Sequence, residues 1–211
     1  MGCINKLSLN SIYAITDTKL TPYENILSFL IPAFEGGVKV LQLRDKHTCD
    51  VDLLPYALKI QEVCKKYNVL FILNDRYHLA QEIKADGVHL GIDDVDEVSF
   101  AKIRDSFDAI IGISCYGDIN RAVIYQELGA DYVAFGSCFA SSTKTSAKQI
   151  SLNILQEAKN KLTIPICAIG GININNITKI KKYNTDMIAI ISDIWQARDI
   201  KEKVELLDRT I

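Results

Sequence analysis

The stretch Ile164-Pro165-Ile166-Cys167-Ala168-Ile169-Gly170-Gly171 is a short apolar run with a proline near its start and two glycines at its end. An extended segment that is apolar on both faces is typical of a strand in a parallel sheet covered by helices. Similar β-rich runs recur along the whole chain. The strands we expect are Ile12–Thr16, Val38–Arg44, Val69–Asn74, Gly87–Leu90, Ile110–Ser114, Tyr132–Gly136, Ile166–Gly170 and Met187–Ser192.

Segments of helical period lie between these runs. In Val51–Tyr67, for example, apolar residues recur at the spacing of one helix face. Eight alternating units with no long linker predict a single α/β domain over residues 1–211, a closed (β/α)8 TIM barrel; an open doubly wound sheet is the alternative. The other expected helices are Tyr23–Glu35, Tyr77–Ile83, Val95–Ser106, Ile119–Leu128, Leu152–Lys161, Ile174–Lys182 and Lys201–Asp208.

Charge and composition narrow the class of partner. The 24 basic and 26 acidic residues give a net charge of −2, which provides no electrostatic footprint for nucleic acid or for an anionic membrane. No apolar run is long enough to cross a bilayer, and the first ten residues lack the apolar centre of a secretory signal. The six cysteines are scattered singly, so we interpret them as reduced thiols of a cytoplasmic protein. The oligomeric state stays open, a homo-oligomer included.

Cationic side chains follow the second expected strand. Gln42, Arg44 and Lys46 alternate in an extended segment, so their side chains share one face, which a barrel strand directs toward its open end. Arg offers a planar fork for phosphate oxygens and Lys a compact charge. This pattern predicts a site for a phosphorylated small molecule. The alternative is a solvated loop with an ordinary surface ion pair.

Carboxylates follow the third and fourth strands. Asp75 and the pair Asp93-Asp94 end neighbouring strands, so two carboxylates can meet across a gap. Hard oxygen ligands of this kind, few in number, suit Mg²⁺ that is completed by water and substrate phosphates. The alternative is that Asp93 or Asp94 caps a helix beginning near Val95.

Later strand ends carry weaker signals. The polar loop Ser137–Gln149 is long for a compact barrel and suits a lid that closes on phosphate; the alternative is a flexible surface loop with no ligand. Gly170-Gly171 and a short helix beginning at Ser192 fit the phosphate site common in such barrels. We interpret His89 as a packing or hydrogen-bonded structural residue, because no nearby group completes a nucleophile–base pair.

Together these motifs resemble the thiamine phosphate synthase family over nearly the whole chain. They appear in the family's order. The matching segments are Gln42–Lys46, Asn74–Arg76, Asp86–Gly91, Gly129–Gly136, Thr143-Lys144 and Ile169–Ile172. The family joins hydroxymethylpyrimidine diphosphate to a thiazole phosphate and releases pyrophosphate with Mg²⁺. The resemblance therefore implies a transferase of thiamine biosynthesis that acts on phosphorylated small molecules.

The resemblance also implies roles for individual residues. The pyrimidine diphosphate would be held by Gln42, Leu43, Arg44, Asp45, Lys46, Asn74, Ser114 and Lys144, of which Arg44, Lys46, Ser114 and Lys144 would be catalytic. The thiazole phosphate would be held by Ser141, Ser142, Thr143, Gly171, Ile191 and Ser192. Asp75 and Asp94 would hold Mg²⁺.

The chain departs from the family pattern at three places. Ile92 stands where the family usually has glutamine, two prolines are missing between Gly136 and Lys144, and Cys115-Tyr116 replaces a frequent Ala-His. Two rival functions remain. One is a thiazole tautomerase on the same barrel, which tends to lose the diphosphate ligands and to use a histidine where this chain has Tyr116. The other is a non-catalytic protein that binds thiamine precursors.

Overall fold

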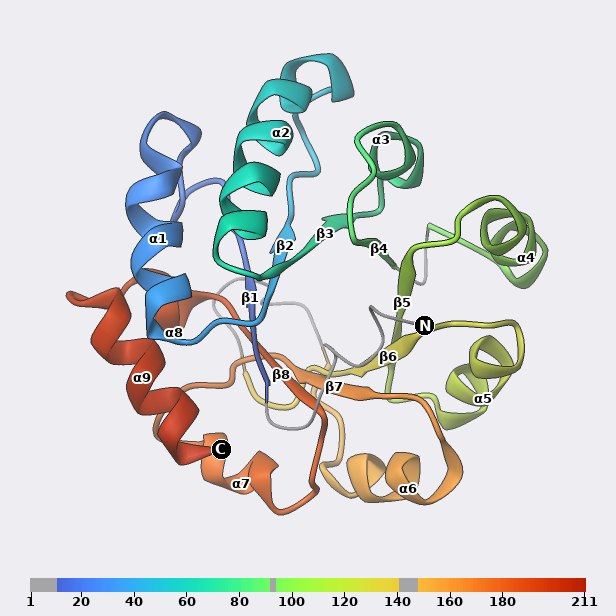
Figure 1. The fold of residues 1–211 in the computed structure, drawn as a ribbon. Helices are drawn as coiled ribbons and strands as arrows, with labels where there is room; N and C mark the ends of the chain where they lie inside the picture. Colours follow the sequence, from blue (N-terminus) through green and yellow to red (C-terminus); the bar gives the residue numbers. More distant parts are fainter. Residues whose placement is uncertain (1–10, 92–93, 141–147) are drawn as a thin grey trace.

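The computed structural model describes residues 11–91, 94–140 and 148–211, and within these ranges eight parallel strands close into a barrel in chain order (Figure 1). The first and last strands pair in parallel, with Tyr13 opposite Ala189, so the sheet has no free edge. This confirms the predicted barrel and excludes the open doubly wound sheet. The strands are β1 (Ser11–Ile15), β2 (Val40–Leu43), β3 (Leu70–Asn74), β4 (Gly87–Leu90), β5 (Ile110–Tyr116), β6 (Tyr132–Phe135), β7 (Ile166–Ile169) and β8 (Met187–Ile190).

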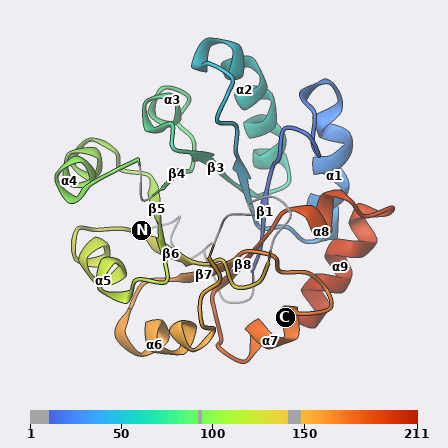
Figure 2. The same cartoon turned by 180° about the vertical axis from the view of Figure 1, so that it is seen from behind.

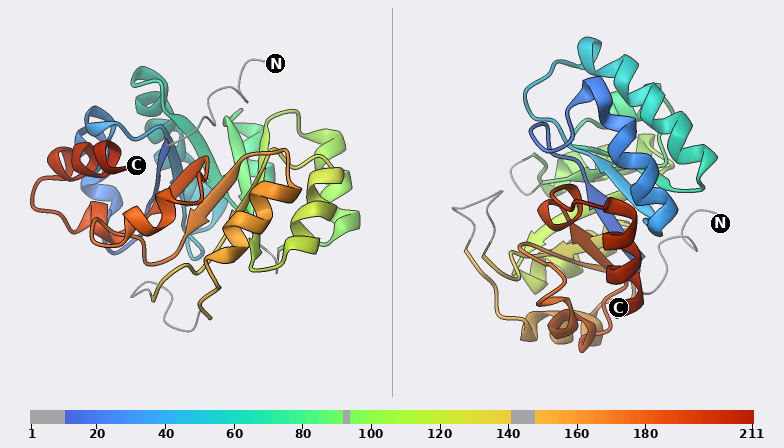
Figure 3. Two further views of the ribbon diagram at one scale, coloured as in Figure 1. Left: turned by 90° about the horizontal axis from the view of Figure 1, so that it is seen from below. Right: turned by 90° about the vertical axis from the view of Figure 1, so that its left-hand side faces the viewer.

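Helices surround the barrel, as the views from the front, the back and the sides all show (Figures 1, 2 and 3). Each covers the outer face of the sheet with an apolar stripe and turns a polar face to solvent. They are α1 (Ile26–Gly36, after a 3-10 turn over Tyr23–Asn25), α2 (Asp50–Lys66), α3 (Tyr77–Glu82), α4 (Glu97–Ser106), α5 (Ile119–Glu127), α6 (Asn153–Lys161), α7 (Ile177–Lys181), α8 (Ser192–Trp195) and α9 (Ile200–Thr210).

Alternation along the strands separates two buried layers. Leu41 and Leu43 of β2 point outward and pack in the layer between sheet and helices, whereas Val40 points into the barrel. The interior layer combines apolar side chains with Tyr13 and Tyr132, whose phenol groups need partners when they are buried. These side chains fill the centre of the barrel.

Two differences from the expected boundaries lie next to the polar strand ends. Helix α4 begins at Glu97, and Asp96 caps it by accepting a hydrogen bond from the Ser99 amide at 2.7 Å. Asp94 is therefore not the cap that the sequence allowed, and Asp93 lies outside the described residues. Strand β5 continues past Ser114 to Tyr116, with a shift of its register against β6.

The cysteines of the described ranges are free thiols. Four of them are buried, as expected for small core residues, and Cys49 is exposed. In the same ranges, no helix combines the length and the apolar character that crossing a membrane requires.

Candidate active site

A cavity of about 200 Å³ opens inside the barrel, at the end where the strands pass into the loops that follow them. This is the end at which barrel enzymes carry their reacting groups. Residues predicted from separate strands meet there. Those that line the cavity are Gln42, Arg44, Lys46, Asn74, Asp75, Asp94, Ser114 and Ile191.

Other predicted residues occupy different places. The side chain of Leu43 is buried between sheet and helices, because it alternates with Gln42 on β2, so it does not reach the cavity. Gly171 and Ser192 do not line the cavity, although their neighbours Gly170 and Ile191 do. Four predicted ligands lie outside the described residues: Ser141, Ser142, Thr143 and Lys144.

Asp45 organises the loop after β2 instead of facing the cavity. Its carboxylate accepts hydrogen bonds from the amides of His47 and Thr48, at 2.7 and 2.9 Å, and from the hydroxyls of Thr48 and Tyr23, at 2.7 and 2.8 Å. Burial raises the pKa of this carboxyl, but the bonds from Thr48, His47 and Tyr23 outweigh burial and hold the pKa well below its ordinary value. The Asp45 carboxylate therefore stabilises the conformation of this loop through its hydrogen bonds.

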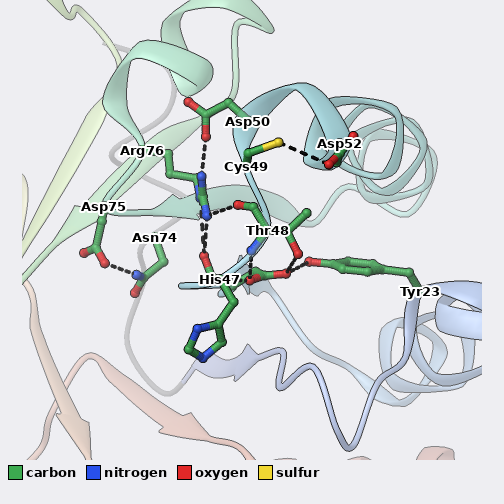
Figure 4. A network of polar contacts seen from close by, with 10 residues as sticks. Tyr23, His47, Thr48, Cys49, Asp50, Asp52, Asn74, Asp75 and Arg76 are labelled. Carbon is green, nitrogen blue, oxygen red and sulfur yellow. Dashed lines mark hydrogen bonds and ion pairs between the residues drawn. The ribbon is translucent and has the colours of Figure 1, made fainter.

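Arg76, which follows β3, holds the same loop from the other side (Figure 4). Its guanidinium donates to the carbonyl oxygens of Asp45, at 2.8 Å, and Thr48, at 2.6 Å, and also pairs with Asp50. The planar fork of arginine suits several acceptors at once. Arg76 and Asp45 together fix the segment from which Lys46 reaches the cavity.

Lys46 meets the two predicted metal ligands. Its Nζ lies 3.1 Å from Asp75 Oδ2 and 4.0 Å from Asp94 Oδ2. Burial, and then the charge of Asp75, raise the pKa of the Asp94 carboxyl, while Lys46 opposes the shift. Gly91 leaves room for these carboxylates, because a Cβ atom there would clash with Asp94 Oδ2 and lie 3.8 Å from Asp75 Oδ1.

This donor set fits a magnesium ion. Mg²⁺ is commonly held by one or two carboxylates, with the remaining positions taken by water and substrate phosphates. Asp75 and Asp94 supply two carboxylates that share one cation, Lys46, at the cavity wall. Among the described residues no group of three or more His, Cys, Asp or Glu side chains could hold a metal.

A row of hydrogen bonds crosses the barrel, and four of its five residues, Tyr13, Gln42, His89 and Ser114, line the cavity. Gln42 Nε2 donates to the Tyr13 hydroxyl at 2.8 Å, which lies 2.9 Å from the Tyr132 hydroxyl. His89 Nδ1 lies 2.9 Å from the Tyr132 hydroxyl, and its Nε2 lies 3.0 Å from Ser114 Oγ. His89 is thus hydrogen-bonded, as the sequence suggested, and burial lowers its pKa to about 4, against the effect of the Asp94 charge.

Among the residues that form this row of hydrogen bonds, Tyr13 and Tyr132 were not identified from the sequence. Tyr13 sits in the middle of β1 and Tyr132 is the first residue of β6, so neither lies at the carboxyl end of its strand, where reacting groups were sought. The available signal was a tyrosine at an inward position of a barrel strand, because its buried hydroxyl needs a partner there.

The paired glycines after β7 have a packing role. Gly170 and Gly171 adopt the left-handed region, with φ of 105° and 61°. A Cβ atom on Gly171 would clash with the Ala140 carbonyl oxygen, and the amides of Cys138 and Phe139 donate to the carbonyl oxygens of Ile169 and Gly170. These glycines therefore let the loops after β6 and β7 lie together at the cavity rim.

Comparison with known proteins gives a consistent result. The family model described as thiamine monophosphate synthase matches residues 12–194. A thiamine-phosphate synthase of Wolinella succinogenes is 47% identical over 191 residues, covering 90% of this chain and 87% of that protein. One of Nitrosococcus oceani is 41% identical over 194 residues, covering 92% and 89%. The solved thiamine phosphate pyrophosphorylase of Pyrococcus furiosus superposes with a TM-score of 0.86 at 31% identity, covering 98% of this chain and 96% of that one.

Proposed function

Because the chain belongs to the thiamine monophosphate synthase family, we propose that it joins 4-amino-2-methyl-5-hydroxymethylpyrimidine diphosphate to 4-methyl-5-(2-phosphoethyl)thiazole. The bond between the pyrimidine methylene carbon and the diphosphate oxygen breaks, and its electron pair leaves with pyrophosphate. The thiazole nitrogen then forms the new bond to that carbon, which gives thiamine phosphate. The observation that carries the proposal is that Arg44, Lys46 and two carboxylates converge on one cavity at the strand ends.

Charge stabilisation is the main task of this site. As pyrophosphate leaves, negative charge grows on its oxygens, and preorganised cations that face those oxygens lower the barrier. In our proposal Arg44 binds the diphosphate with its fork and Lys46 with its point charge, and both line the cavity. No strong base is needed, which agrees with a His89 ring that is engaged in hydrogen bonds.

The remaining contacts of the pyrimidine diphosphate are assigned to Gln42, Asn74 and Ser114, which line the cavity, and to Lys144. For the thiazole phosphate we propose Ile191 at the cavity wall, with the neighbouring Gly171 and Ser192. The sequence adds Ser141, Ser142 and Thr143 to this second group. These two phosphorylated precursors are the partners we propose, and the free thiols of Cys64 and Cys167 suit a reducing cytoplasm.

Asp75 and Asp94 are the proposed ligands of Mg²⁺. When bound, the ion neutralises charge on the diphosphate and helps it to leave. The protein's own part is to hold the two carboxylates together beside Lys46. Lys46 offsets part of their negative charge, and it lines the same cavity in which the diphosphate would lie.

Substitution of one carboxylate tests this assignment. Asp75→Ala should remove Mg²⁺-dependent release of pyrophosphate, measured with both substrates over a magnesium titration. Asp118→Asn is the matched control, because Asp118 caps α5 on the outer layer by accepting from the Arg121 amide, and asparagine can do the same. Unchanged turnover and magnesium dependence in Asp75→Ala would overturn the metal assignment.

A further inference from the structure

In the row of hydrogen bonds from Gln42 to Ser114 at the cavity, the donor and the acceptor of each bond can be assigned. The first of these hydrogen bonds begins at the amide nitrogen of Gln42. This nitrogen can only donate, so the Tyr13 oxygen accepts. The Tyr13 hydroxyl proton then needs an acceptor inside the barrel. Its partner is the Tyr132 oxygen at 2.9 Å, so Tyr13 donates to Tyr132.

The directions of the two remaining hydrogen bonds, from Tyr132 to His89 and from His89 to Ser114, follow from this one. Tyr132 has accepted from Tyr13 and donates its own proton to His89 Nδ1, at 2.9 Å. His89 must therefore carry its ring proton on Nε2, from which it donates to Ser114 Oγ at 3.0 Å. If Nδ1 carried a proton instead, it would donate to Tyr132 and Tyr132 would donate to Tyr13. The buried Tyr13 proton would then have no acceptor among the described residues.

Packing holds the rings at the centre of this row in place. Tyr132 is fully buried and meets Tyr13 edge to face, with ring centroids 6.1 Å apart, and stacks on His89 at 5.5 Å. Gly112 of β5 makes room for the phenol, because a Cβ atom there would overlap the Tyr132 ring. The tyrosine and histidine rings of this hydrogen-bonded row are therefore held in place by packing and have little freedom to rearrange.

The direction fixes what Ser114 offers to a ligand. Its oxygen accepts from His89, which leaves its own hydroxyl proton to be donated, and within the described part of the chain no other group takes that proton. Ser114 lines the cavity. We propose that Tyr132 is a positioning residue that holds His89 with its proton on Nε2, so that Ser114 donates to an acceptor atom of the bound substrate. For its effect on activity, this inference rests on the proposed function of the cavity.

The ring protonation can be read directly. The chain has three histidines, and His47 and His78 are both exposed, so the variants His47→Gln and His78→Gln assign the ¹⁵N signals of the His89 ring. We expect an acceptor-type shift for Nδ1 and a proton-bearing shift for Nε2. A proton on Nδ1 in the wild-type protein would overturn the inference. This experiment does not depend on enzyme activity, so its failure can be distinguished from a failure of the proposed function.

The second experiment asks whether Tyr132 acts through Ser114. Tyr132→Phe should lower kcat/KM roughly tenfold to a hundredfold and give a mixture of His89 tautomers, because it removes the only proton that fixes Nδ1. Ser114→Ala should lower kcat/KM by at least as much. The double variant should lose no more than Ser114→Ala alone. Additive losses, or unchanged tautomers in Tyr132→Phe, would contradict the proposed path.

Tyr125→Phe is the matched control. Tyr125 is equally buried, but its hydroxyl donates to the Val95 carbonyl oxygen at 3.1 Å in the outer layer, and neither residue lines the cavity. Its loss should cost stability without moving the His89 signals or kcat/KM. If Tyr125→Phe changed them as much as Tyr132→Phe, the effect would be general loosening of the barrel and the positioning role would be rejected.

Discussion

Arg76 Nη2 donates to the backbone carbonyl oxygen of Asp45 at 2.8 Å, joining the end of β3 to the loop that follows β2. The residue after Asp45 is Lys46, whose ammonium group faces the two carboxylates at the cavity. Arg76 therefore positions the loop that carries Lys46, while its own guanidinium is engaged with that loop's backbone.

The first prediction concerns this bond. Arg76→Lys should raise KM for the pyrimidine diphosphate about tenfold, because one ammonium group cannot serve the acceptors that the guanidinium fork serves. KM for the thiazole phosphate should change little. Steady-state kinetics with each substrate varied in turn measures both values.

A matched arginine provides the control. Arg104 binds Asp131 at 2.9 Å and the Ala109 carbonyl oxygen at 2.9 Å, outside the cavity. Arg104→Lys should destabilise the protein without raising KM for the pyrimidine diphosphate. Equal KM values in the two variants would remove Arg76 from its positioning role.

The second prediction is a pH dependence of stability. The pKa of the Asp45 carboxyl is held below its ordinary value of 3.8, so its ionised form stabilises the fold above that pH, and the contribution is lost as the pH falls through the folded-state pKa. Asp45→Asn should therefore lower the free energy of unfolding by about 2 kcal/mol at neutral pH. The difference from the wild type should shrink in acid.

Denaturant unfolding at a series of pH values measures this difference. Asp52→Asn is a suitable control, because Asp52 is an exposed residue of the first turn of α2. Its effect should be small at every pH. A difference for Asp45→Asn that stayed constant from neutral to acid pH would mean that the Asp45 charge does not stabilise the loop.

The third prediction concerns Gly91. Gly91→Ala would drive a methyl group against Asp94 Oδ2, so we expect the apparent affinity for Mg²⁺ to fall about tenfold, with turnover partly restored at high magnesium concentration. A magnesium titration of pyrophosphate release measures it. An unchanged titration curve would show that Asp94 has room to move or does not bind the ion.

Much of this molecule could be predicted from the sequence because two signals were strong. Apolar runs such as Ile166–Ile169 alternate with amphipathic helices, which indicated the barrel. Alternation of Gln42, Arg44 and Lys46 predicted one shared face, and all three line the cavity, although β2 ends at Leu43 and the last two follow it. The same alternation explains the place of Leu43, whose side chain turns to the helices.

Other features depend on contacts that only the fold creates. Asp45 carries the same charge as Asp75, but the amides and hydroxyls that surround it come from a loop conformation and from the distant Tyr23. The row of hydrogen bonds through Tyr13 and Tyr132 joins residues 119 positions apart. A tyrosine at an inward strand position indicates a buried hydroxyl that needs a partner, but the local sequence does not say which residue that partner is.

The most direct test of the central claim is a product balance. Purified protein, Mg²⁺ and both phosphorylated precursors should yield thiamine phosphate and pyrophosphate in equal amounts, followed by mass spectrometry and a pyrophosphate assay in the same sample. The account predicts that Arg44→Ala and Asp94→Ala lower both products together. Isomerised thiazole phosphate, or bound precursors with no pyrophosphate, would contradict it.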